Sequence, residues 1–326
     1  MNYIGSKYRL SSWIKDTINK NGGMKDKIFC DIFAGTGAVA RSVKKDVKQV
    51  IINDIEPYSY ALNRNYIGNH IAFGYQEILE ELNKLKPREG FVYKNYCLGG
   101  SGERQYFSDE NGLKIDAIRV EIEKYKRDEN LYYFLLASLL ESADKVANTA
   151  SVYGAYLKHL KKSAQKSMIL EAAVFEENEA EHQVFNEDAN SLIKKIEGDI
   201  LYLDPPYNHR EYGANYHILN TIALYDEFNP KGKSGLREYK KSRYCKKNEV
   251  HSAFEELVKE ANFKYIFLSY NNEGIMSQKD VETIMKKYGS YGLETKEYQR
   301  FKADKTQNRN HKADMTFEYL HILEKY

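Results

Sequence analysis

Short apolar runs, each bounded by turn residues, predict four strands along the chain. They cover 27–33, 48–54, 199–204 and 264–270. Between or after them, apolar residues recur at the spacing of one helix face. These helical patterns cover 38–45, 58–67 and 131–146. Strands rich in Ile and Val that alternate with helices are typical of a parallel sheet with helices on both faces, so the predicted fold class is α/β.

One connection is too long for a simple α/β unit. More than a hundred residues separate the second predicted strand from the third, whereas such connections are ordinarily short. We therefore expect an inserted, mainly helical region at 69–182. The remaining segments, 1–68 and 183–326, would form one catalytic domain.

A glycine-containing turn follows the first predicted strand. Asp31-Ile-Phe-Ala-Gly35-Thr-Gly37 leads from that strand into a helix, where glycines allow close approach of the backbone to a ligand. An ordinary tight turn is the alternative. The third glycine of the dinucleotide fingerprint and a GxxxxGK[ST] loop are both missing, which disfavours nicotinamide and ATP. Asp54, at the end of the next strand, is placed to accept both ribose hydroxyls. Together they favour an adenosine without phosphate.

The third predicted strand ends in Asp204-Pro205-Pro206-Tyr207. Two successive prolines fix the backbone and remove two donors, which leaves a rigid ledge between a carboxylate and an aromatic ring. A planar base could stack on Tyr207 while its amino group donates to the Asp204 carboxylate and the Pro205 carbonyl. The alternative is a proline-rich turn with a buried tyrosine. Since parallel strands end at one edge of a sheet, we expect this tetrapeptide beside the glycine turn.

Composition adds a few constraints. The chain holds 49 Lys and Arg against 47 Asp and Glu, so its net charge neither requires nor excludes a polyanionic partner. The charges are nevertheless grouped: the stretch 229–247 is strongly basic and 171–188 is acidic. Three dispersed cysteines without a CxxC argue against disulfides and structural zinc. With no long apolar segment, we expect a cytoplasmic protein without a metal.

These motifs occur in an order that resembles a known family, the Dam-like, alpha-group DNA adenine methyltransferases of restriction-modification type. The matching segments are YIGSKYRL at 3–10, DIFAGTG at 31–37, NDIEP at 53–57, FNEDA at 185–189, DPPY at 204–207 and LSYNNEG at 268–274. The resemblance implies a Rossmann-like methyltransferase sheet and an inserted DNA-recognition region. It also implies S-adenosylmethionine as cofactor, with S-adenosylhomocysteine as product, and a flipped adenine in double-stranded DNA as substrate.

The resemblance also implies roles for individual residues. The cofactor's methionine end would lie by Tyr3, Gly5, Lys7, Asp31, Phe33, Gly35 and Gly37. Its ribose and adenine would be held by Asp54, Ile55 and Asp188. The target amine would be held by Asp204, Pro205, Pro206 and Tyr207 and would attack the sulfonium methyl directly.

DNA contacts are expected from basic and aromatic residues outside that set. The candidates are Lys145, Asn148, Tyr153, Tyr156, Lys158, Lys161, Lys162, Tyr212, Tyr216, Lys240, Lys241 and Arg243. We expect a monomer or a weak dimer, and a separately acting cognate restriction endonuclease is a candidate partner. Two alternatives stay open: an RNA methyltransferase on the same fold, and a catalytically silent DNA-binding regulator. Asp rather than Asn before the two prolines disfavours the first.

Overall fold

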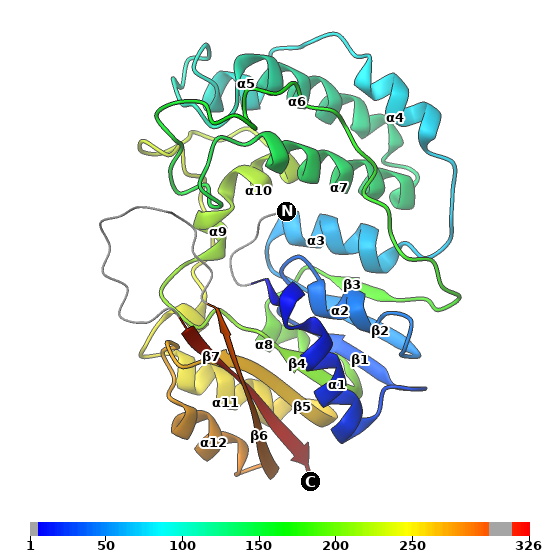
Figure 1. Cartoon of the computed structure of the whole chain (residues 1–326), viewed down its shortest axis with the longest axis vertical. Coiled ribbons are helices and arrows are strands. Elements are labelled where there is room, and N and C mark those ends of the chain that lie inside the picture. The colour runs from blue at the N-terminus through cyan, green and yellow to red at the C-terminus, as the bar shows by residue number, and fades with distance from the viewer. Residues whose placement is uncertain (1–5, 300–314) are drawn as a thin grey trace. The chain divides into compact units, whose positions relative to one another are not determined.

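The computed structural model describes residues 6–299 and 315–326. Its strands form one seven-stranded sheet in the order β3-β2-β1-β4-β5-β7-β6. Figure 1 shows this sheet with the strand labels. The strands are β1 (Ile28–Asp31), β2 (Gln49–Asn53), β3 (Gln183–Phe185), β4 (Glu197–Leu203), β5 (Asn262–Asn271), β6 (Gly289–Gln299) and β7 (Met315–Lys325).

The four strands predicted from apolar runs are confirmed as β1, β2, β4 and β5. All pairings among β1 to β5 are parallel, but β7 pairs antiparallel with both β5 and β6. The predicted parallel sheet is therefore confirmed for β1 to β5, whereas the antiparallel pairings of β7 were not predicted. The edge strand β6 carries many polar residues, as solvent-facing edge strands do, and so lacks the apolar run that marks the central strands.

By internal contacts the chain forms two compact units. The first comprises Glu56–Glu179 and Tyr212–Lys240; the second comprises the described residues up to Ile55, then Ala180–Glu211 and the described residues from Lys241 on. These bounds differ from the expected division at 68 and 183, because 56–68 and 212–240 fold with the insertion. The functional division into catalytic and recognition parts stays a prediction.

The second unit holds the sheet and the helices around it. They are η1 (Lys7–Arg9), α1 (Ser11–Gly22), α2 (Ala38–Val43), α8 (Ala189–Leu192), η4 (Arg243–Cys245), α11 (Val250–Glu260) and α12 (Gln278–Met285). One sheet face, with Cys30 and Leu201, packs in a core shared with α8, α11 and α12. On the other face Gly22 of α1 lies against Tyr265, and α1 reaches α2 through Lys15. Helices thus cover both faces, as predicted.

The first unit is helical. It contains α3 (Pro57–Asn63), a π-helical turn η2 (Arg64–Gly68), α4 (Gln76–Asn83), α5 (Phe91–Tyr96), α6 (Asp109–Ile122), η3 (Glu123–Tyr125), α7 (Glu129–Val146), α9 (Tyr212–Asn215) and α10 (His217–Leu224). Asp128 caps α7, the predicted long helix, by accepting from the Leu131 N–H. The buried Arg119 of α6 donates to the carbonyls of Ile222 and Ala223, so it satisfies the C-terminal end of α10.

Candidate active site

The glycine turn after β1 has the backbone that its sequence predicts. Gly35 and Gly37 have φ of 52° and 72°, which are left-handed values that favour glycine, and Gly37 caps the start of α2. The Gly35 N–H donates to Oδ2 of Asp54 over 2.7 Å. The Ala34 N–H donates to the carbonyl of Asn53 at the end of β2. The glycine turn after β1 and Asp54 after β2 are therefore hydrogen-bonded to each other, as expected because parallel strands end at the same edge of the sheet.

Three carboxylates influence one another around this turn. Asp31 ends β1 and is buried, and its Oδ1 has no hydrogen-bond partner among the described residues. Burial, together with the carboxylates of Asp204 and Asp54, raises the pKa of Asp31 well above its ordinary value. A cationic ligand would relieve this concentration of negative charge. S-adenosylmethionine carries a sulfonium and an ammonium group, so the donor set fits that cofactor.

The Asp204 tetrapeptide lies directly beyond β4. Pro205 is buried, and Pro206 and Tyr207 are partly exposed. The ring of Tyr207 packs edge-on against Tyr270 of β5, with ring centroids 6.0 Å apart. The backbone carbonyl of Tyr207 accepts from the Ile275 N–H over 2.8 Å. The tyrosine is thus fixed at its backbone and along one edge of the ring. A partly exposed, fixed ring is suited to stacking on a planar base.

Lys7 binds two carboxylates in this site. Its Nζ lies 3.1 Å from Oδ1 of Asp204 and 2.8 Å from Oε1 of Glu318 on β7. Burial alone would lower the pKa of Lys7, but Asp204 and Glu318 outweigh it and hold that pKa well above its ordinary value. Lys7 is the cation expected near the cofactor, and the structure places it against the carboxylate of Asp204. Sequence reasoning missed Glu318 entirely.

Burial raises the pKa of Asp204 from 3.8 to about 6, while Lys7 lowers it and Glu318 raises it. A carboxylate with this pKa is still ionised near neutral pH. It is also a stronger proton acceptor than an exposed aspartate. This pKa suits a group that first accepts hydrogen bonds from an amine and later accepts a proton.

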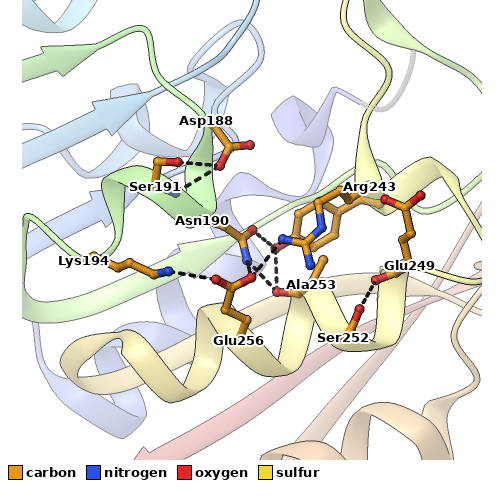
Figure 2. Close-up of polar contacts among 10 residues, drawn as sticks. Asp188, Asn190, Ser191, Lys194, Arg243, Glu249, Ser252, Ala253 and Glu256 are labelled. Atoms are coloured by element: carbon orange, nitrogen blue, oxygen red, sulfur yellow. Dashed lines mark hydrogen bonds and ion pairs between the residues drawn. The ribbon is translucent and has the colours of Figure 1, made fainter.

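The remaining residues expected to bind the cofactor are Phe33, Ile55 and Asp188 of the second unit, together with Tyr3 and Gly5. Phe33 packs edge-on against Tyr244, and Ile55 is exposed. Asp188 caps α8, with its Oδ1 accepting from the N–H and the hydroxyl of Ser191, as Figure 2 shows. Among the described residues, the hydrogen bonds of this cap engage Oδ1 of Asp188 and not its Oδ2. The expected contact of Asp188 with the cofactor's adenine stays a prediction. Tyr3 and Gly5 lie outside the described residues.

Arg243 is held in an ion-pair network beside that cap. It donates to Glu256 over 2.8 Å, and Lys194 and Asn190 donate to the same carboxylate (Figure 2). Hydrogen bonds from Lys194 and Arg243 lower the pKa of Glu256 to about 2. The charge of Arg243 is thus opposed by a carboxylate from α11, outside the basic stretch, and its expected contact with DNA stays a prediction.

The rest of the basic stretch divides in two. Several side chains have acidic partners: Lys231 pairs with Glu238, Arg237 with Asp226 and Lys246 with Glu249. Other side chains are exposed and form no ion pair with an acidic residue in the part of the chain that the structure describes, namely Lys233, Lys240, Lys241 and Lys247. The positive charge available to an anionic partner thus resides in this smaller set.

Two expected DNA contacts lie in the interior of the first unit. The Asn148 amide donates to the carbonyls of Gln105 and Leu157 and accepts from the Lys161 N–H. The Tyr153 hydroxyl donates to Asp144. Both side chains are fully buried. The expectation that they contact DNA is corrected, because their polar atoms hold the segment after α7 in place.

The chain contains 28 tyrosines and one tryptophan, and many of the tyrosines lie in the core of the first unit. Tyr216, expected on the DNA side, is fully buried and packs against Tyr58, Tyr153 and Tyr212. Tyr156 is partly exposed and meets the ring of Tyr106 edge-on. The tyrosines of this core are Tyr58, Tyr66, Tyr96, Tyr106, Tyr132, Tyr153 and Tyr216.

The remaining lysine candidates differ in their partners. Lys145 is paired with Glu171 over 2.6 Å, and the Lys161 ammonium donates to the Thr149 carbonyl. Lys158 and Lys162 are exposed. Across 6–299 and 315–326, no three His, Cys, Asp or Glu side chains gather as a metal site would require. Over the same residues, no helix has the length and apolarity of a membrane span.

Fold and site together define a Rossmann-like methyltransferase that uses S-adenosylmethionine. The parallel strands end in a glycine turn, the carboxylate of Asp54 that accepts from that turn, and a partly buried Asp-Pro-Pro-Tyr ledge, on a sheet with an antiparallel strand β7. Residues 3–284 match the family of D12 class N6 adenine-specific DNA methyltransferases. The chain belongs to this family, and the adenine-specific DNA methyltransferase activity predicted from its motifs is confirmed at that level.

Curated relatives extend over the whole chain. It is 63% identical to the Type II methyltransferase M.NlaIII of Neisseria lactamica, covering 100% of this chain and 99% of that protein. It is 39% identical to the Type II methyltransferase M.CviAII of Paramecium bursaria Chlorella virus 1, covering 92% of each. The Type II methyltransferase M.FokI of Planomicrobium okeanokoites is 38% identical over 100% of this chain, which spans 53% of that longer protein. The narrower placement in the Dam-like alpha group stays a prediction.

Proposed function

We propose that the protein methylates the exocyclic amine of an adenine within a specific duplex DNA sequence, as the protective half of a restriction-modification system. The curated relatives named Type II methyltransferases support the restriction-modification role. A separately acting endonuclease that cuts the same sequence is the expected partner. The observation that carries the proposal is the partly buried Asp204, ion-paired with Lys7 and followed by two prolines and a fixed tyrosine.

The residues of the second unit would act in the following way. S-adenosylmethionine supplies the methyl group. The Asp54 carboxylate accepts from the ribose hydroxyls, and Asp31 holds the positive end of the methionine portion. The Asp204 carboxylate and the Pro205 carbonyl accept the two amine hydrogens, which directs the nitrogen lone pair at the methyl carbon. Tyr207 stacks on the extruded base and offsets part of the cost of flipping it.

The first unit would supply target recognition, together with the exposed lysines of the basic stretch. Lys233 and Lys240 are exposed there, and Lys241 and Lys247 follow in the second unit. Contacts from these ammonium groups to phosphates would make DNA affinity fall steeply with salt. Base reading would fall to other side chains of the helical unit.

Transfer of labelled methyl from S-adenosylmethionine tests the proposal. The substrates would be duplex DNA that contains all short sequences, the same DNA as single strands, and RNA of matching sequence. We expect label in the duplex only, at N6 of adenine. Asp204→Ala should abolish transfer and leave cofactor binding by calorimetry nearly unchanged. Label in RNA alone, or in no nucleic acid, would refute the proposal.

The restriction-modification role needs a second experiment. Sequencing of methylated bases in DNA from a host that expresses the chain should reveal adenine methylation at one short sequence. Loss of that methylation in a host expressing Asp204→Ala is the matched control. Methylation at adenines without a common sequence would contradict a protective, site-specific role.

A further inference from the structure

We propose that Glu318 is a positioning residue for methyl transfer, which shares Lys7 with Asp204 and thereby keeps Asp204 able to accept the proton that the target amine loses. The inference rests on the proposed function and adds to it a residue that lies far along the chain from every motif of the site. In this proposal Glu318 contacts neither the target base nor the cofactor. It acts through the charge of Lys7.

The contacts that carry this inference lie in the interior of the second unit. Oε1 of Glu318 is 2.8 Å from the Lys7 ammonium, closer than the 3.1 Å between that ammonium and Oδ1 of Asp204. The Ser269 hydroxyl also donates to Oε1 of Glu318, over 2.6 Å. The Glu318 side chain is 0% exposed and the Lys7 side chain 6%. Water therefore screens this pair less than it screens an ion pair on the surface.

The sheet register explains why these groups meet. Strand β7 pairs antiparallel with β5, and Glu318 lies opposite Asn271 at the end of β5 where the parallel strands also end. Ser269 lies two residues earlier on β5, so its side chain points to the same face as Asn271. β4 ends beside β5 and leads directly into Asp204. The antiparallel strand thus returns a carboxylate to the edge of the sheet that holds the site.

Glu318 changes the balance of charge around Asp204. The described cluster contains one ammonium and two carboxylates, so ionised Asp204 shares its cation with a second anion. Without Glu318 the whole ammonium charge would favour ionised Asp204, and the carboxylate would be a weaker base. With Glu318 these three described groups carry an excess negative charge, which proton uptake by Asp204 removes.

That uptake balances the transfer step. The lone pair of the adenine amine forms the new N–C bond while the C–S bond breaks and leaves its electron pair on sulfur. The amine nitrogen then bears a positive charge and has become acidic. One of its protons passes to the Asp204 carboxylate, and the electrons of that N–H bond return to nitrogen. Water removes the proton from Asp204 in the next step.

Other titratable groups also surround Asp204. Among the described residues these are Asp31, Tyr202 and Tyr207. Burial raises the pKa of both tyrosines, so they stay protonated near neutral pH and supply no charge. Asp31 adds negative charge when ionised, but it is the same in every variant below. A difference between variants at Lys7 or Glu318 therefore reports the shared ammonium.

The test compares Glu318→Gln with Lys7→Met. The glutamine keeps the shape of Glu318 and can still accept from Ser269, but it carries no charge. We expect kcat for methyl transfer to fall about tenfold while KM for DNA changes less than about twofold. The acid limb of the kcat profile, expected near the Asp204 pKa of about 6, should move down by about one unit. Lys7→Met should move the limb upward, and Glu318→Asp should restore part of the rate.

A second measurement reads the coupling without DNA. Carboxyl carbon NMR of protein labelled at aspartate, with the Asp204 signal assigned by its loss in Asp204→Asn, gives the titration of that group in the free protein. Glu318→Gln should lower the midpoint and Lys7→Met should raise it. If the wild-type protein transfers no methyl group, the proposed function fails while this titration still decides the inference.

The inference is overturned if both the acid limb and the Asp204 titration of Glu318→Gln match those of the wild type. A lower rate with an unmoved limb would show a merely structural role and would also overturn it. Should Glu318→Gln fail to fold, Lys7→Met decides, because a midpoint that stays or falls in that variant contradicts the shared ammonium.

Discussion

Replacing Asp204 with Asn should stabilise the protein while it abolishes methyl transfer. Burial raises the pKa of Asp204 from 3.8 to about 6, so the ionised form is disfavoured in the folded protein relative to the unfolded chain. This difference between the folded and unfolded pKa of Asp204 corresponds to about 3 kcal/mol. Asparagine has no charge to bury, and Lys7 keeps Glu318 as a partner. We therefore expect a gain in the free energy of unfolding of about 1–3 kcal/mol at pH 8.

The gain in the free energy of unfolding depends on pH because folding raises the pKa of Asp204. Because the folded pKa lies above the unfolded one, the wild-type protein is most stable, as far as Asp204 is concerned, below pH 3.8. That stability is lost as the pH rises through about 6. The difference between Asp204→Asn and the wild type should accordingly be full at pH 8, smaller at pH 5 and nearly absent near pH 4.

Urea unfolding followed by tryptophan fluorescence measures this difference. The chain has a single tryptophan, Trp13, and it lies in α1 of the unit that contains Asp204. Asp199→Asn is a matched control: Asp199 accepts from the Ile28 N–H and from Lys27, and its pKa is lowered, so this variant should gain nothing. A gain for Asp204→Asn that is absent, or equal at pH 5 and pH 8, would refute the reasoning.

Three further predictions concern the other residues of the site. Changing Lys240 and Lys241 together to Gln should reduce the slope of log affinity against log salt on duplex DNA by about 2, whereas Arg243→Gln, whose charge Glu256 already opposes, should barely alter it. An equal slope in all three proteins would contradict this division. Asp54→Ala should weaken S-adenosylmethionine binding at least about tenfold in calorimetry, because Gly35 loses its acceptor and the ribose loses a carboxylate. Asn148→Ala should lower the free energy of unfolding by about 2–4 kcal/mol and leave the salt slope unchanged; a stable variant with a shallower slope would restore the DNA-contact interpretation.

The parts of the site that were predictable share one property: their signal is local in the sequence. Asp204 follows an apolar strand and precedes two prolines, and Asp54 follows the strand after the glycine turn. Because parallel strands end at one edge of the sheet, placing each strand also placed the residue after it. The hydrogen bond from Gly35 to Asp54 is the direct outcome of that rule.

Burial and charge pairing were not predictable in the same way. Asn148 and Tyr153 lie in a polar, glycine-containing segment whose sequence resembles a surface loop, yet their side chains are in the core. Arg243 stands in a stretch with few acids, but Glu256 reaches it from a helix that follows that stretch. In both cases the deciding partner is set by tertiary packing, which a local pattern does not contain.

Glu318 illustrates the limit most clearly, since 311 positions separate it from Lys7 and only the antiparallel pairing of β7 with β5 brings the two together. A carboxylate in a strand read from sequence alone is a solvent-facing residue by default, because burying an unpaired charge is costly. The cost is lowered here because Lys7 is already buried beside Asp204. A cation buried with one carboxylate can accept a second, and the second then tunes the first. We therefore expect that, where a lysine is buried beside a catalytic carboxylate, a neighbouring antiparallel strand can supply a second buried acid.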